Sequence, residues 1–117
     1  MTMKIYTYSG CSTCKKATKW LDAAGVEYEE RAIQKQPPTK TELRAMLRHL
    51  GDRKKLFNVS GQDYRKLGMK DRLPDMKDTE VIDLLASNGN LIKRPFVIGE
   101  DFGTVGFKEP VWQELFG

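Results

Sequence analysis

The sequence contains few of the side chains that usually hold a structural metal ion. Two of its 117 residues are cysteines and one is a histidine. Zinc takes four protein ligands in structural sites, and Cys11, Cys14 and His49 would supply three at most. We therefore expect no metal site, and we expect His49 to be a surface or half-buried helix residue.

Long apolar segments are also missing. No stretch approaches the roughly 20 apolar residues that a membrane-spanning helix requires. The first residues, 1–5, lead directly into a strand-like segment and lack the apolar region and cleavage site of a signal peptide. The sequence therefore predicts a cytoplasmic protein with no membrane partner.

The charge pattern gives little support for nucleic-acid binding. The net charge is +4, but 20 Lys and Arg residues are interleaved with 16 Asp and Glu residues. The densest basic run, 53–55, has Asp52 beside it. Because a nucleic-acid footprint needs basic residues gathered on one face, a mixed solvated surface is the favoured interpretation, with no direct nucleic-acid partner.

The first 33 residues have the pattern of a strand, a helix and a second strand. Alternating β-branched and aromatic residues predict a strand over 4–9, and Gly10 ends it. A helical pattern follows from Ser12 or Thr13 to Gly25, and 26–33 has strand character. A unit of this kind normally places its two strands parallel, with a right-handed crossover.

The middle of the chain is predicted to be helical, over about 37–88. Thr39 and Glu42 have the spacing of a capping box ahead of an amphipathic segment that reaches Leu50. A polar, broken stretch follows, with short helical pieces, and then a helix that we expect Asp78 to cap.

The last third changes to strands and a final helix. Strand character is expected at 91–92, 96–98 and 104–105, with a turn over 99–103 and a short helix that begins at Pro110. The whole chain, 1–117, therefore forms a single α/β domain of the order β-α-β, helical insert, β-β-α, with a mixed sheet.

Cys11 and Cys14 are the strongest candidates for chemistry. A disulfide between them would close too short a loop to stabilise the fold, which favours reversible redox use. Cys11 lies just before a helix start, where unpaired backbone N–H groups and Lys15 favour a thiolate, the reactive form of cysteine. Cys14 lies inside the helix and is better placed to resolve a mixed disulfide. The alternative is that both are small buried hydrophobic residues.

Arg94-Pro95 is the second candidate. A proline in a strand-like run marks an edge, a bulge or a cis peptide bond. Arg94 beside a thiolate could stabilise it or hold an oxyanion through a bidentate contact. The alternative, equally compatible with the pattern, is a surface arginine before an edge proline.

Taken together, four segments resemble the arsenate reductase-like proteins of the thioredoxin superfamily, which include the Spx and MgsR regulators. The resemblance covers essentially the whole chain and is carried by YSGCSTCKKA (8–17), FNVSG (57–61), DLLASNGNLIKRP (83–95) and VGFKE (105–109). It implies a thioredoxin-like fold with a helical insert and a cis peptide bond at Pro95.

The resemblance also implies roles at the site. Cys11 matches the nucleophile of the arsenate reductases, and Arg94 matches one of the three arginines that bind the oxyanion. The positions of the other two are occupied by Asn58 and Lys108, which leaves less fixed positive charge for an oxyanion. Arg94, Lys108 and the backbone of Pro95 could also receive glutathione, which some relatives bind.

Cys14 is absent from the single-cysteine reductases, and its presence resembles Spx and MgsR, in which the pair is a disulfide switch. Two functions follow. The first is a thiol–disulfide oxidoreductase with Cys11 as nucleophile and Cys14 as resolving thiol. It would act on a small oxyanion or disulfide and bind no cofactor. Glutathione with glutaredoxin, or thioredoxin, would donate its electrons. The alternative is a redox-switched regulator that binds the RNA polymerase α subunit.

Overall fold

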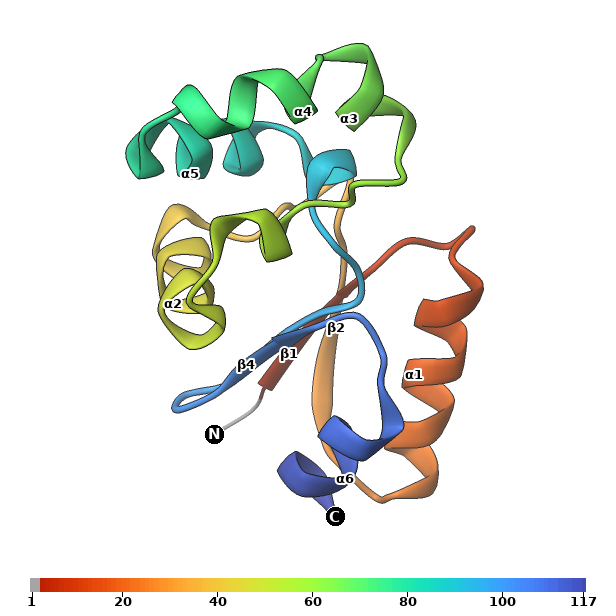
Figure 1. The fold of residues 1–117 in the computed structure, drawn as a ribbon. Coiled ribbons are helices and arrows are strands. Elements are labelled where there is room, and N and C mark those ends of the chain that lie inside the picture. The colour runs from red at the N-terminus through yellow and green to blue at the C-terminus, as the bar shows by residue number, and fades with distance from the viewer. Residues whose placement is uncertain (1–2) are drawn as a thin grey trace.

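Four strands form one mixed sheet with the order β2-β1-β3-β4 (Figure 1). The computed structural model describes residues 3–117. The strands are β1 (Met3–Thr7), β2 (Tyr28–Ala32), β3 (Phe96–Ile98) and β4 (Gly103–Val105). β1 is parallel to β2 and antiparallel to β3, which is antiparallel to β4. The parallel first pair and the mixed sheet confirm the prediction.

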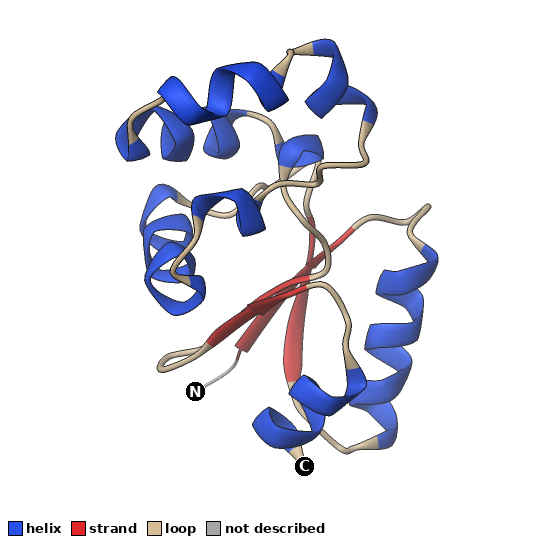
Figure 2. Cartoon of the chain, viewed as in Figure 1, coloured by secondary structure: helices blue, strands red, loops and turns tan. Residues whose placement is uncertain are grey.

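Helices cover both faces of this sheet (Figure 2). On one face lie α1 (Ser12–Ala23) and α6 (Glu109–Phe116), whose residues Leu21 and Trp112 pack with Ile5 and Val97 in one buried cluster. Because neighbouring residues of a strand point to opposite faces, Phe96 belongs to the core on the other side.

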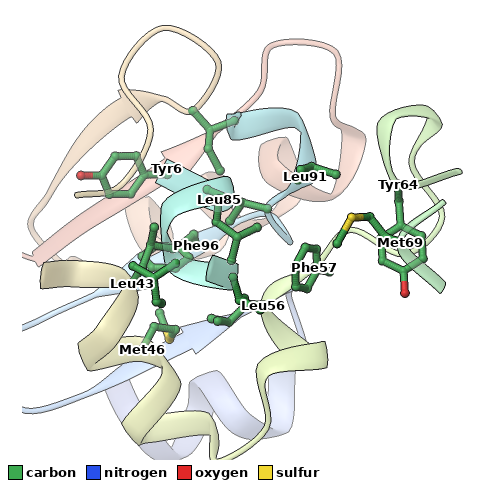
Figure 3. Packing of buried hydrophobic residues seen from close by; sticks show 14 of the residues in the cluster. Tyr6, Leu43, Met46, Leu56, Phe57, Tyr64, Met69, Leu85, Leu91 and Phe96 are labelled. Atoms are coloured by element: carbon green, nitrogen blue, oxygen red, sulfur yellow. The ribbon is translucent and has the colours of Figure 1, made fainter. Parts of the chain in front are cut away.

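The second core lies between the sheet and the helical segment 40–91 (Figure 3). That segment contains α2 (Lys40–Leu50), η1 (Arg53–Leu56), α3 (Gln62–Lys66), α4 (Met69–Arg72), η2 (Leu73–Asp75), α5 (Asp78–Ser87) and η3 (Gly89–Leu91). Leu43 and Met46 of α2 and Leu85 of α5 are fully buried in it. η3 approaches the chain after β2 so closely that a Cβ at Gly89 would lie 1.9 Å from the Ile33 carbonyl oxygen. Only glycine fits there.

Several local predictions hold. Thr39 and Glu42 form both hydrogen bonds of a capping box at the start of α2. Gly51 ends that helix in the left-handed conformation, with φ of 73°. His49 is exposed on the helix. Pro110 lies in the first turn of α6.

Three local predictions are wrong. Asp78 is the first residue of α5 and not its cap; the cap is Lys77, whose backbone N–H donates to Glu80 Oε1 at 2.8 Å. Residues 91–92 do not form a strand: Leu91 ends η3, and Ile92 makes an isolated bridge with Phe57. The first two strands are also shorter than predicted, because the chain leaves the sheet at Thr7 and rejoins it only at Tyr28.

None of the helices within residues 3–117 combines the length and apolar character needed to cross a membrane.

Candidate active site

Cys11 occupies the N-cap of α1, between the end of β1 and the first helical turn. Its backbone is extended, with φ of −95° and ψ of 109°, and its N–H donates to the Tyr8 carbonyl at 3.0 Å. Its Sγ accepts the backbone N–H of Cys14 at 3.2 Å. The first turn of α1 contains no acidic residue. The Cys11 sulfur therefore lies at the positive end of the α1 dipole, in contact with a backbone N–H of the first turn.

Cys14 lies one turn further along α1 and faces the interior. It is 2% exposed, on the same buried face as Ala17 and Leu21. Burial, and then the hydrogen bond with the Cys11 side chain, raise the pKa of the Cys14 thiol to about 12, against smaller opposing effects of the Tyr8 backbone and Arg94. Cys14 is therefore protonated at neutral pH. The two thiols, both reduced, differ in exposure and in their surroundings.

Arg94 lies immediately before β3. The Arg94–Pro95 peptide bond is cis, as the resemblance implied. The guanidinium carbon of Arg94 is 4.7 Å from the centroid of the Tyr8 ring, a cation–π contact that holds the half-buried side chain in place. The positive charge of Arg94 acts to lower the pKa of the Cys14 thiol, by less than burial raises it.

A groove of about 760 Å³ begins at the first turn of α1 and runs past η1 and β4. Thr13, Arg94 and Lys108 line it, so the structure brings two of the predicted anion-binding residues to one surface. Lys54, Lys55 and Lys93 also line it. The site has more cationic residues than the sequence prediction named.

Those three lysines were not predicted as site residues. Two of them belong to the run 53–55, which had the pattern of solvated surface. Their proximity arises from contacts between distant segments. The Lys93 N–H donates to the Leu56 carbonyl at 2.8 Å, next to the bridge between Phe57 and Ile92. The basic run 53–55 was visible in the sequence, but nothing in that run indicated that it would lie close to the segment that contains Lys93.

Three other residues that the sequence predicts at the site do not line the groove. Lys15 is exposed on α1 and does not line the groove. Pro95 is buried and does not line the groove. The Asn58 side chain lies over Gly61, with its amide nitrogen 2.7 Å from where a Cβ of that glycine would stand. In this conformation Asn58 supports its own turn, and its role in anion binding stays a prediction.

Comparison with known proteins places this geometry in a family. The ArsC family profile matches residues 6–115. The uncharacterized protein YusI of Bacillus subtilis is 47% identical over 115 residues, which cover 97% of this chain and 98% of YusI. The global transcriptional regulator Spx of Listeria innocua is 30% identical over 106 residues, covering 90% of this chain and 79% of Spx.

A solved structure agrees with the sequence comparisons. The structure of a possible arsenate reductase from Streptococcus mutans superimposes with a TM-score of 0.90 at 39% identity, with 97% of both chains covered. The chain is thus related both to arsenate reductase-like proteins and to Spx regulators, and it shares their thioredoxin-like fold. It belongs to the ArsC family.

Proposed function

We propose that this protein is a thiol–disulfide oxidoreductase that uses Cys11 as nucleophile and Cys14 as resolving thiol. The supporting observation is the asymmetry of the pair. Cys11 is half-buried and its Sγ accepts a helix N–H, whereas Cys14, one turn further along α1, is buried. A pair with one accessible and one sheltered sulfur is suited to two successive exchange steps.

In the first step the Cys11 thiolate attacks one sulfur of a substrate disulfide. A bond forms between Cys11 Sγ and that sulfur, the substrate S–S bond breaks, and the second substrate sulfur leaves as a thiolate. The Cys14 N–H contacts Cys11 Sγ, and the positive end of the α1 dipole lies beside it, so both interact favourably with the negative charge of the attacking sulfur.

In the second step Cys14 attacks Cys11 Sγ and releases the remaining substrate thiolate. The Cys14 proton passes to the thiolate that leaves in this step, and the thiolate released in the first step takes from solvent the proton that Cys11 lost when it ionised. The substrate thus gains two electrons and two protons, and the protein ends as the Cys11–Cys14 disulfide. Burial keeps Cys14 protonated until a mixed disulfide places an electrophilic sulfur beside it. Glutathione with glutaredoxin, or thioredoxin, would supply the two electrons that restore the dithiol.

Arg94 is proposed to stabilise the negative charge that moves between sulfurs. Its guanidinium is fixed by the Tyr8 ring and lines the groove next to Thr13. Lys108 lines the same groove and could assist with an anionic substrate. A preorganised cation at a developing charge contributes a few kcal/mol to catalysis.

The test is steady-state reduction of a small disulfide and of arsenate, with glutathione/glutaredoxin and thioredoxin each tried as donor. We expect turnover by the wild type with at least one donor and none by Cys11→Ser. If the wild type is no faster than Cys11→Ser with any donor, the proposed oxidoreductase activity is refuted.

The relationship to Spx supports one alternative, a redox-switched regulator that binds the RNA polymerase α subunit. The observation in its favour is the presence of a second cysteine within reach of Cys11. A regulator would show no turnover, yet would bind the C-terminal domain of the α subunit in its oxidised form and not in its reduced form. A pull-down with both redox forms distinguishes the two functions.

A further inference from the structure

The groove that begins at the first turn of α1 passes Arg94 and extends along an open edge of the sheet. β4 is the last strand in the order β2-β1-β3-β4, so no strand formed by residues 3–117 lies on its far side. Residues 103–106 all line the groove. The unpaired edge of a strand can accept another chain as an additional strand.

The register identifies which backbone groups face this edge. Gly99 N–H donates to the Phe102 carbonyl at 2.9 Å, and Gly106 N–H donates to the Pro95 carbonyl at 2.8 Å. In an antiparallel pair hydrogen-bonded residues alternate, so the even-numbered residues of this strand face β3. The N–H and C=O of Gly103 and Val105 therefore point to the open side, where no backbone group within residues 3–117 pairs with them.

The walls of the groove are strongly cationic. Five lining residues carry positive charge and one, Asp52, carries negative charge, a net charge of +4. The cations come from both sides: Lys54 and Lys55 from η1, Lys93 and Arg94 from the segment before β3, and Lys108 from the segment after β4. Such a surface attracts an acidic ligand.

The groove is also larger and more apolar than a single oxyanion requires. Its volume of about 760 Å³ is within the range that encloses extended organic ligands. Val59 and Val111, which are 44% and 40% exposed, line it and are two of the four large hydrophobic residues exposed in the described chain. An exposed apolar lining beside cations and free backbone groups suits a polypeptide better than an inorganic anion.

We propose that this groove binds an extended acidic polypeptide segment, which adds to the sheet as a fifth strand alongside β4. Its backbone pairs with Gly103 and Val105, and acidic side chains face the lysines of η1. Alternate side chains of a strand point to opposite sides, so every second residue can contact the apolar lining. Nucleic acid matches the charge but has no peptide groups to pair with a strand edge.

The probe is a peptide of about eight residues that alternates glutamate and valine. It is added to the reduced full-length protein while amide hydrogen exchange is followed by NMR. Exchange at Gly103 and Val105 should slow in the complex. Unchanged exchange at both amides, or no binding at about millimolar peptide, would overturn the proposal.

Two versions of the peptide, N-methylated either at all glutamates or at all valines, test the strand pairing. Only one set of backbone N–H groups can face β4, so one version should bind and the other should lose binding. Equal binding of both versions would contradict strand addition.

Charge reversal tests the cationic wall away from the cysteines. Lys54→Glu with Lys55→Glu should weaken peptide binding by about ten-fold or more. The matched control, Lys66→Glu with Lys70→Glu, makes the same charge change at exposed positions outside the groove and should alter binding by less than about two-fold. Equal weakening by both pairs, or displacement of the peptide by a single-stranded oligonucleotide that binds more tightly, would overturn the assignment.

Binding of the peptide requires no thiol chemistry. A protein with Cys11→Ser and Cys14→Ser should bind it as the wild type does, so the docking proposal and the proposed enzyme activity can fail separately.

Discussion

At the scale of single residues, the two cysteines differ in burial although they share one helical turn. Cys11 Sγ is held by a backbone N–H, whereas Cys14 is 2% exposed and has a pKa of about 12. At pH 8 a thiol with so strongly raised a pKa is almost entirely protonated. We therefore expect Cys11 to react with electrophiles faster than Cys14 does.

We predict that Cys14→Ser, which retains Cys11, reacts with iodoacetamide at pH 8 more than about a hundred-fold faster than Cys11→Ser, which retains Cys14. Mass spectrometry against time gives both rates. In denaturant the two proteins should react at similar rates, because the difference comes from the fold. Equal rates in native buffer would contradict the assigned roles.

Arg94 allows a second prediction at this scale. Arg94→Lys keeps the positive charge but loses the planar group that stacks on Tyr8. We expect turnover to fall about ten-fold or more, while the free energy of unfolding changes by less than about 1 kcal/mol. Lys15→Arg, at an exposed position outside the groove, is the control. Unchanged turnover of Arg94→Lys would remove the arginine from the mechanism.

At the scale of elements, Glu42 joins α2 to β1. Its carboxylate accepts from the Tyr6 hydroxyl at 2.6 Å, from Lys4 Nζ at 3.2 Å and from the Thr39 backbone N–H at 3.0 Å. Burial alone would raise the pKa of Glu42, but these hydrogen bonds outweigh it and lower the pKa below its ordinary value. The ionised form is therefore favoured in the folded protein.

A lowered pKa stabilises the fold above the ordinary pKa of 4.5, and this stabilisation is lost as the pH falls through the lower, folded-state value. We expect Glu42→Gln to lower the free energy of unfolding by about 1–2 kcal/mol at pH 7, with a difference that shrinks below about pH 4.5. Urea unfolding across pH measures it, with the exposed Glu114→Gln as control. A difference independent of pH would rule out this linkage.

Arg53 holds together two elements of the helical segment. Its guanidinium donates to the carbonyls of Leu73, at 2.7 Å, and Met76, and it pairs with Asp78 at 3.3 Å. These contacts fix η2 and the start of α5 against η1.

Arg53→Ala is therefore expected to cost about 2 kcal/mol and to accelerate hydrogen exchange in α5 more than in β1. Urea unfolding and amide exchange measure the two effects, and the exposed Lys70→Ala should change neither. If Arg53→Ala unfolds at the same urea concentration as the wild type, these contacts contribute nothing to the free energy of unfolding.

At the scale of the whole molecule, local sequence patterns predicted the order of helices and strands. Contacts between distant residues determine which side chains bond to one another and which share the groove. The capping box of Thr39 and Glu42 is a four-residue signal, and it was found. The bonds of Glu42 to Tyr6 and Lys4 span 36 and 38 positions and leave no local signal. For the same reason, nothing in the sequence indicated that Lys54 would share a groove with Lys93.

The errors have a similar origin. The apolar pair 91–92 has strand character, but the turn at Asn88 and the close approach of Gly89 to Ile33 leave room for one 3₁₀ turn and a single bridge. The placement of Cys11 before α1 and of Cys14 inside it could be predicted, because its signal, two cysteines at a strand-to-helix junction, lies within a few residues.

The central claim, that Cys11 attacks and Cys14 resolves, is tested most directly by mass spectrometry after brief exposure to a small disulfide. Wild type should yield the Cys11–Cys14 disulfide, two hydrogens lighter than the dithiol, and Cys14→Ser should accumulate a mixed disulfide on Cys11. Cys11→Ser should remain unmodified. A mixed disulfide on Cys14, or a wild type that stays a dithiol while Cys14→Ser is also unmodified, would contradict the account.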